Sequence, residues 1–217
     1  MRDNSCESRQ HPEEFGIRTL TRHSKTSGGL SLSGRGYSTV KRLLTARLVG
    51  TPMEPRHFAE IRTPHSDPRV MATLSADGNI FSEDQTRAFL LRAAEHWSLH
   101  DFGLWIFHSS GTGGFVGYGG IKHAIVEGKD EIELAYAVGS AYWNMGFATE
   151  MSEAALKVGF RELRLERIVA FTVPHNKGSR SVMEHCGFIY QHDIVHAGLP
   201  HVLYQLDSGD YGARSKI

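Results

Sequence analysis

The stretch that most constrains the fold of this chain runs from Glu131 to Glu150, EIELAYAVGSAYWNMGFATE. Its first eight residues alternate between large apolar side chains and small or charged ones, which predicts a strand over residues 131–138. The strand breaks at Gly139, and helical spacing begins near Phe147. A glycine-bearing turn between a strand and a helix leaves main-chain N–H groups free at the positive end of the helix dipole. The pattern therefore predicts a phosphate site at this turn.

Composition and charge narrow the class of protein. Forty per cent of the 217 residues are hydrophobic, enough for one packed core. Lys and Arg together number 24, as do Asp and Glu, so nothing indicates a nucleic-acid-binding surface over the whole domain. No apolar run has the length of a membrane span or of a signal-peptide core, so we expect a cytoplasmic protein with no membrane partner. The two cysteines, Cys6 and Cys186, fit a reducing compartment.

The thirteen histidines raise the question of a metal site. His96 and His100 are four residues apart, which places them on one face if a helix extends that far. In the zinc pattern His-Glu-x-x-His a Glu follows the first histidine, whereas Trp97 follows His96, and the sequence offers no third ligand in a recognisable position. We therefore predict that the protein holds no metal, and that these are exposed histidines at a helix end.

Three segments are expected. Residues 1–40 are rich in Ser, Thr, Gly and Arg and lack apolar periodicity, which predicts a flexible N-terminal extension. Their Arg-rich composition is shared with organellar transit peptides, but acidic residues near the start favour a solvated tail or a translation start placed too far upstream. Residues 41–207 form the domain, and residues 208–217 are expected to be a polar C-terminal tail.

Within the domain, the pattern predicts a mixed α/β fold in the order β-α-α-β-β-β-α-β-α-β-β. A helix beginning at Pro55 is expected to end at Pro64 and Pro68, and Ser82 to Gln85 form a capping box for the next. The expected strands are 47–53, 104–108, 115–121, 131–138, 167–173, 189–194 and 202–206, and the later helices are 147–163 and 178–186.

The glycine-rich segment Gly111 to Gly120 allows two interpretations. Gly111-Thr112-Gly113 resembles the start of a dinucleotide-binding fingerprint, which would indicate an oxidoreductase. That fingerprint requires a helix after the glycines, whereas residues 115–121 have the pattern of a strand. A hairpin turn between two antiparallel strands is therefore the favoured interpretation.

Two motifs carry a resemblance to a known family. The run Trp143 to Ala148 resembles the phosphate loop of the GNAT N-acetyltransferases, Arg/Gln-x-x-Gly-x-Gly/Ala. It is similar to the Tyr-Trp-x-x-Gly-Tyr-Ala-Thr-Glu form of the ribosomal-protein N-terminal (alanine/serine) acetyltransferase subgroup, and it departs from the general pattern at Trp143.

The second motif is VPHNKGSRSVMEHCGF, residues 173–188, in which Asn176, Ser179, Gly187 and Phe188 fit the family. The resemblance covers roughly Thr45 to Leu206. It implies the GNAT fold, a central, mostly antiparallel sheet flanked by helices.

The resemblance also implies a cofactor site. We expect the turn to hold the pyrophosphate of coenzyme A and the preceding strand to hold the acyl group of acetyl-CoA. Asn176 is implied to bond the pantetheine arm, although its position also suits a helix cap. Ser179 is implied to lie near the thioester sulfur or the phosphates. The remaining cofactor residues are expected to be Tyr136, Ala137, Val138, Trp143, Asn144, Met145, Gly146, Phe147, Ala148 and Thr149.

The implied reaction is direct attack of an amine on the thioester, with no covalent acyl-enzyme. Glu131 and Glu133 share one face of their strand, and we favour Glu133, acting through a water, as the base. A main-chain N–H of the strand would stabilise the oxyanion. Met183 stands where many relatives have a tyrosine acid, so Ser179 or a water is expected to protonate the leaving thiolate, with Tyr136 or Tyr142 as further candidates. Neutralising an α-amine of pKa about 8 costs about 3 kcal/mol less than neutralising a lysine, which favours a protein N-terminus or a small-molecule amine as acceptor.

Several alternatives stay open. The chain could be a non-catalytic module that binds acyl-CoA and regulates, because the tyrosine acid is absent. Trp97, Phe102 and Trp105 could line the acceptor groove, but a core role for Trp105 is at least as well supported. Both a monomer and a homodimer fit the sequence.

Overall fold

The computed structural model describes residues 41–75 and 77–214 of the chain. The predicted extension of residues 1–40 lies outside the described residues, as does the end of the predicted C-terminal tail, residues 215–217.

The elements in chain order follow the expected alternation, with short additions. They are β1 (Leu43–Leu44), β2 (Leu48–Pro52), the 3₁₀ turn η1 (Pro55–His57), α1 (Phe58–His65), α2 (Pro68–Leu74), α3 (Glu83–His100), β3 (Leu104–Ser109), β4 (Phe115–Val126), β5 (Lys129–Val138), the 3₁₀ turn η2 (Ser140–Tyr142), α4 (Phe147–Lys157), the π-helical turn η3 (Val158–Glu162), β6 (Arg167–Thr172), α5 (Lys177–His185), β7 (Ile189–His196), β8 (Leu199–Asp207) and α6 (Ser208–Arg214).

The strands of the described residues form one eight-stranded sheet in the order β1-β2-β3-β4-β5-β6-β8-β7. Every neighbouring pair is antiparallel except β5 and β6, which run parallel. The mixed, mostly antiparallel sheet predicted from the sequence is therefore confirmed.

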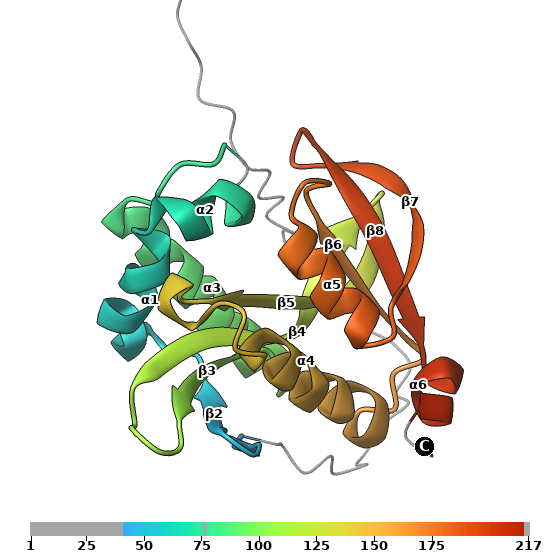
Figure 1. Ribbon diagram of the computed structural model, residues 1–217, viewed down its shortest axis with the longest axis horizontal. Coiled ribbons are helices and arrows are strands. Elements are labelled where there is room, and N and C mark those ends of the chain that lie inside the picture. The colour runs from blue at the N-terminus through green and yellow to red at the C-terminus, as the bar shows by residue number, and fades with distance from the viewer. Residues whose placement is uncertain (1–40, 76, 215–217) are drawn as a thin grey trace, which may run out of the picture. The chain divides into compact units, whose positions relative to one another are not determined.

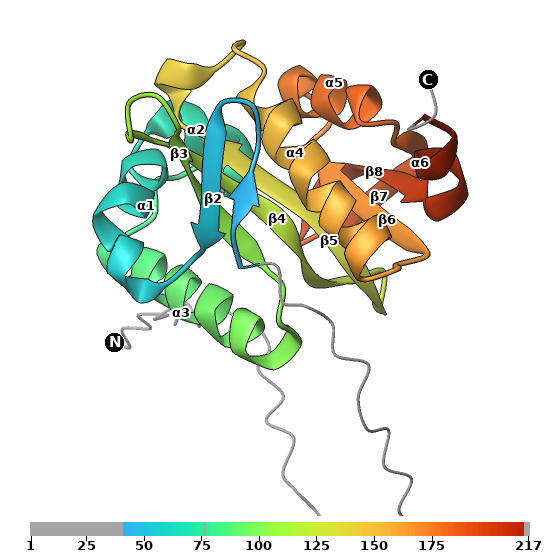
Figure 2. The same ribbon diagram turned by 90° about the horizontal axis from the view of Figure 1, so that it is seen from below.

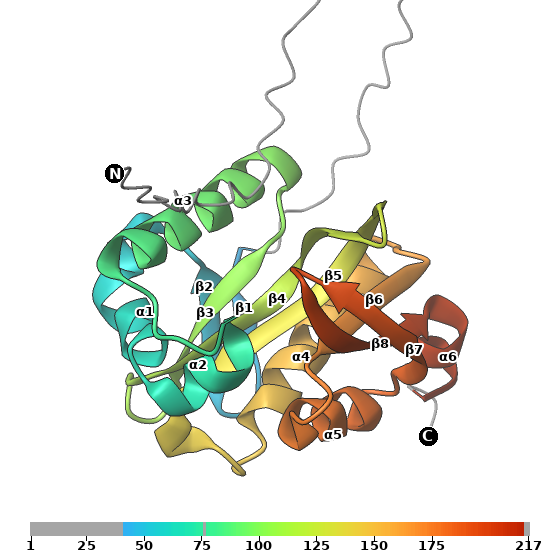
Figure 3. The ribbon, with the colours of Figure 1, turned by 90° about the horizontal axis from the view of Figure 1, so that it is seen from above.

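Helices cover both faces of the sheet. On one face α4 packs across β4 and β5, and α5 lies beside it (Figure 1). On the other face α1 and α3 pack together, as the turned views show (Figures 2 and 3). Two cores result. Trp105, Phe107 and Met151 belong to the α4 side, and Ile61 and Leu90 belong to the α1–α3 side.

The prolines after α1 act differently from the prediction. Pro64 lies inside α1, which ends one residue later, and Pro68 begins α2 instead of ending a helix. Proline suits a first helical position because the N–H that it lacks has no partner there. The Asp67 side chain caps this start by accepting from the Arg69 N–H at 3.0 Å. The sequence analysis missed α2 for this reason.

The C-terminal segment also departs from a plain polar tail. Residues 208–214 form α6, and the Tyr211 ring stacks on Phe160 with centroids 4.7 Å apart. Tyr211 is the one large apolar side chain of these seven residues, so no periodic signal predicted this helix.

The glycine-rich segment forms the predicted hairpin. Ser109 donates its N–H to the Gly114 carbonyl at 2.9 Å, and β3 and β4 pair antiparallel on either side. A Cβ at Gly120 would collide with the carbonyl O of Gly103, and one at Gly117 with that of Ala137. The glycines therefore serve close packing of strands, and the dinucleotide interpretation is wrong.

Trp97, Phe102 and Trp105 are buried in one hydrophobic cluster, so the structure supports their core role over the acceptor groove. Among the described residues, no helix combines the length and apolar character needed to cross a membrane.

Candidate active site

The sheet opens between β5 and β6. The ladder joining these strands registers one pair, Glu133 with Val169, although β5 continues to Val138 and β6 to Thr172. Gly139 donates its N–H to the Val116 carbonyl on β4 at 2.9 Å. Because hydrogen-bonding groups alternate along a strand, the N–H groups of Tyr136 and Val138 point the other way, towards the opening. The sequence analysis predicted that the acyl group lies beside these two residues.

The turn after β5 leads into α4 through two residues in left-handed conformations, Asn144 with φ 60° and Gly146 with φ 77°. Gly146 is the N-cap of α4, and no side chain caps this helix start. Within the part of the chain that the structure describes, no group accepts a hydrogen bond from the N–H groups of residues 144–149. A helix start in this state presents several donors and a positive dipole end to an external anion.

Trp143 closes the turn on the strand side. Its indole N–H donates to the Val138 carbonyl at 2.9 Å, so the ring ties the turn to the end of β5. The sequence analysis assigned Trp143 to the cofactor. The structure gives it a positioning contact, and a contact with the cofactor stays a prediction.

An ion-pair network anchors the turn from the opposite side. Glu150, one turn into α4, accepts from the Thr45 hydroxyl at 2.6 Å, from the Arg47 N–H at 2.8 Å and from Arg47 Nε at 2.7 Å. Arg47 Nη1 also donates to the Met145 carbonyl at 2.9 Å, and its guanidinium lies 4.3 Å from the Phe147 ring centroid. Burial alone would raise the pKa of Glu150, but the hydrogen bonds from Thr45 and Arg47 outweigh it and lower that pKa. Thr45 and Arg47 had no signal in the sequence, because they lie about a hundred residues from the motif.

Tyr136 and Asn176 connect β5, β6 and α5. The Tyr136 hydroxyl donates to the Ser179 carbonyl at 3.1 Å and lies 3.0 Å from Ser179 Oγ, and burial raises the pKa of Tyr136. Asn176 Oδ1 accepts from the Ser179 N–H at 3.1 Å, while Nδ2 donates to Thr172 Oγ1 at 3.0 Å. Asn176 is therefore a helix cap in this structure, the second of its two expected roles. The contact with a pantetheine arm stays a prediction.

Both predicted carboxylates are paired. Glu133 is buried and bonded to Lys122, its cross-strand neighbour on β4, and Glu131 accepts from Arg167 Nη2 at 2.8 and 3.0 Å. Glu133 is also the last paired residue of β5 before the opening, whereas Glu131 lies two residues further back. Position therefore distinguishes the two carboxylates.

The β7–β8 hairpin adds an imidazole to this region. Burial lowers the pKa of His196, the Glu133 carboxylate raises it, and His201 and Lys122 lower it, with a net decrease. His196 is therefore neutral at neutral pH. Its ring lies 4.4 Å from that of Phe171 on β6. The sequence analysis missed His196 because strand pairing, and no local motif, brings the hairpin to this place.

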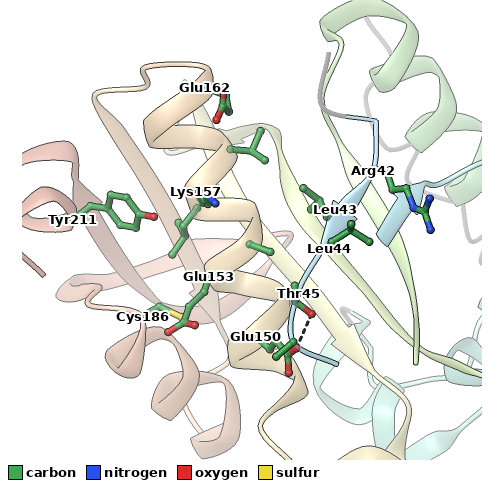
Figure 4. A pocket seen from close by; sticks show the side chains of 14 residues that line it. Arg42, Leu43, Leu44, Thr45, Glu150, Glu153, Lys157, Glu162, Cys186 and Tyr211 are labelled. Atoms are coloured by element: carbon green, nitrogen blue, oxygen red, sulfur yellow. Dashed lines mark hydrogen bonds between the residues drawn. The ribbon is translucent and has the colours of Figure 1, made fainter. Parts of the chain in front are cut away.

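A cavity of about 650 Å³ lies along α4, against β1 and α6 (Figure 4). Thr45 and Glu150 line it at one end, joined by the hydrogen bond drawn in the figure, and the thiol of Cys186 and the ring of Tyr211 line it elsewhere. No residue of β5 or β6 lines this cavity, so it adjoins the anchor of the turn and is separate from the opening of the sheet.

Comparison with known proteins gives concordant matches. The sequence profile of the acetyltransferase (GNAT) domain matches residues 47–189. The FsC-acetyl coenzyme A-N(2)-transacetylase of Aspergillus fumigatus is 29% identical over 157 residues. That match covers 68% of this chain and 65% of the relative, which is less than two thirds of its length.

Solved structures share the fold. A GNAT-family acetyltransferase of Bordetella pertussis has 26% identity and a TM-score of 0.66, with 76% of this chain and 98% of that chain covered. RimL, a ribosomal L7/L12 α-N-protein acetyltransferase in complex with coenzyme A, has 12% identity and a TM-score of 0.63, with 76% and 97% covered. At that identity the likeness to RimL concerns the fold alone. The profile match spans more than half of the sequence, and the chain therefore belongs to the acetyltransferase (GNAT) domain family.

Proposed function

We propose that this protein transfers the acetyl group of acetyl-CoA to a primary amine by direct attack within a ternary complex. The observation that carries the proposal is the set of N–H groups of residues 144–149, which no described residue occupies, at the uncapped start of α4. Those donors suit the pyrophosphate of coenzyme A. The half-exposed Arg47 guanidinium, which is ion-paired with Glu150, fixes the turn through the Met145 carbonyl.

The opening of the sheet supplies a path for the pantetheine arm and N–H donors for the reacting carbonyl. A pantetheine arm that enters between β5 and β6 would run along the N–H groups of Tyr136 and Val138. Either group could donate to the oxyanion that forms when the amine nitrogen attacks the carbonyl carbon. The new C–N bond forms, the C–S bond breaks, and the thiolate of coenzyme A leaves and takes up a proton. We propose that this proton comes from water, directly or relayed through Ser179 Oγ, which is bonded to the Tyr136 hydroxyl.

The attacking amine must lose a proton, and Glu133 is our proposed base through a bridging water. Its place at the point where β5 and β6 separate supports this role over Glu131. Lys122 is bonded to the carboxylate and fixes its position on the strand. His196 is a second possible acceptor of the proton, because it is neutral and close enough for the Glu133 charge to affect its pKa.

The acceptor class follows from the cost of neutralising the attacking amine. The name of the Aspergillus relative describes N(2)-transacetylation, which is transfer to a nitrogen. We propose a protein N-terminal α-amine or a small-molecule amine as acceptor, since either costs less to neutralise than a lysine.

The test combines binding and turnover. Acetyl-CoA and CoA should raise the melting temperature of the purified full chain, and acetyl-CoA should release free thiol when peptides with free N-termini or small amines are added. Glu133→Gln should lower turnover about a hundredfold or more and leave the Kd for CoA unchanged. Glu131→Gln, on the same strand and face, is the matched control and should change turnover only a few-fold.

Other outcomes reassign the roles. If His196→Asn abolishes turnover and Glu133→Gln does not, the base is His196. Tight CoA binding with no thiol release from any amine would favour the second candidate function, a non-catalytic acyl-CoA-binding regulatory module. The ion pairs of both carboxylates are the observation that favours that module. Failure of CoA and acetyl-CoA to bind would overturn the proposal and the module together.

A further inference from the structure

Three histidines converge where the last turn of α3 meets β4, away from the opening of the sheet. His96 and His100 come from α3 and His123 from β4. One ring nitrogen of each lies within 4.8 Å of one of each of the others. His100 is exposed and the other two are half-buried, so an ion from solvent can reach the cluster.

The sequence analysis could not predict that His123 lies beside His96 and His100. His96 and His100 alone are a pair at i and i+4, and His123 joins them because β4 passes the end of α3. The His123 main-chain N–H donates to His96 Nε2 at 3.0 Å, which fixes the distance between helix and strand at this point.

Two of the three imidazoles are held in the way that metal-ligating histidines are held. His96 Nδ1 lies 2.9 Å from the Phe102 carbonyl O, and His123 Nδ1 lies 3.0 and 3.1 Å from the two Asp130 carboxylate oxygens. A ring that donates from Nδ1 to a carbonyl or a carboxylate carries its lone pair on Nε2, and these partners orient and strengthen the ligand. In His96 that lone pair now accepts from the His123 N–H.

The arrangement of the rings fits a common centre. The ring centroids are 4.5 Å apart for His96 and His100, 4.4 Å for His100 and His123, and 5.7 Å for His96 and His123. Zinc with Zn–N bonds of about 2.0–2.1 Å in tetrahedral geometry places its nitrogens about 3.3–3.4 Å apart. Rotation of the exposed His100 side chain would bring its ring nitrogen closer to those of His96 and His123. His96 Nε2 would exchange its hydrogen bond from the His123 N–H for a metal bond.

We propose that His96, His100 and His123 bind a zinc ion, with water in the fourth position and Asp130 supporting His123. Three neutral nitrogen ligands and an open position are a common zinc coordination set. The ion would join the C-terminal end of α3 to β4, on the helical layer opposite α4. None of its residues lies at the turn or at the β5–β6 opening, so this site is separate from the candidate active site, although His123 is next to Lys122 in β4.

The experiment titrates the purified full chain, free of any histidine tag, with Zn²⁺ by calorimetry, and with Co²⁺ as a spectroscopic probe. The expected result is one equivalent of Zn²⁺ per chain, a rise in melting temperature that a chelator reverses, and the visible absorption of tetrahedral Co²⁺. His100→Ala should weaken Zn²⁺ binding tenfold or more, and Asp130→Asn should weaken it about tenfold. Circular dichroism should show that both variants remain folded.

Other histidines of the chain can bind Zn²⁺ weakly, so the control must resemble His100. His185 is the last residue of α5 as His100 is of α3, and both side chains are exposed. His185→Ala should leave Zn²⁺ affinity and the Co²⁺ spectrum unchanged. Equal loss in His100→Ala and His185→Ala, or no loss in His100→Ala, would overturn the site. An octahedral Co²⁺ spectrum without loss in Asp130→Asn would also overturn it, since it would indicate a loose surface contact.

Discussion

The starts of α3 and α4 satisfy their polar groups in opposite ways. At α3, Ser82 Oγ accepts from the Gln85 N–H at 3.1 Å, and Gln85 Oε1 accepts from the Ser82 N–H at 2.7 Å. Thr86 Oγ1 donates to the Ser82 carbonyl at 3.1 Å and lies 3.2 Å from Nδ1 of the buried His65. The first turn of α3 is thus closed by partners within the protein.

The start of α4 is open. Gly146 provides no capping side chain, and the N–H groups that follow have no acceptor among the described residues. The contacts around this turn, from Trp143 and Arg47, hold its shape without occupying its donors. The comparison teaches that polar groups satisfied internally serve stability, whereas those left open at a rigid turn are available for a ligand. Substitutions should then separate the two effects.

The largest expected effect is on stability, at the closed region. Burial, and then the Arg62 charge, lower the pKa of His65 to about 4, from 6.5 in an unfolded chain. The unfolded state therefore binds more protons between these values, so the contribution of His65 is full above pH 6.5 and is lost as pH falls towards 4, by about 3 kcal/mol. His65→Phe should be less stable at pH 7, with a gap that narrows by that amount at pH 4 in urea unfolding. A constant gap would contradict the assignment.

The next effect is on binding, at the open region. Met145 is 51% exposed in the turn, so Met145→Glu places a carboxylate beside the proposed phosphate donors. Repulsion should weaken CoA binding about 30-fold, or about 2 kcal/mol, with little change in melting temperature. Met145→Lys is the matched control and should bind CoA equally or more tightly. Equal weakening by both charges would mean that the turn does not hold phosphate.

A pair of cap deletions gives the smallest effect and sharpens the comparison. Ser82→Ala and Asn176→Ala each remove a side-chain cap and should each cost about 1 kcal/mol of stability in denaturant unfolding. Only Asn176→Ala should also weaken CoA binding, by a few-fold, because its amide has hydrogen-bonding capacity beyond its two present bonds. If the two variants bind CoA equally, Asn176 is a cap alone.

Local signals explain how much of the fold the sequence could predict. The alternation in β5, the capping box of α3 and the glycine at the start of α4 each lie within a few residues, and each led to the right element. Missed elements had weak local signals. Pro68 fits the end of one helix as well as the start of the next, so α2 was missed. In α6 a single aromatic ring among seven residues gave no periodicity.

The candidate site follows the same division. The turn could be predicted because a strand, a glycine and a helix adjoin in the chain. Lys122, His196 and the Arg47 anchor could not, because cross-strand pairing and the β7–β8 hairpin bring them to the carboxylates and the turn. His123 also could not be predicted to join the histidine cluster, because the packing of β4 against α3 brings it there.

The anchor at Thr45 and Arg47 has a consequence for where the chain can be cut. These residues precede β2, so a protein trimmed by a protease or begun at a later start site could keep seven of its strands and both cores nearly whole. It would lose the contacts that hold Glu150 and the Met145 carbonyl. Such a shortened form would melt almost normally and, if the turn holds coenzyme A as proposed, would bind it poorly, so an assay of folding alone would not detect the defect.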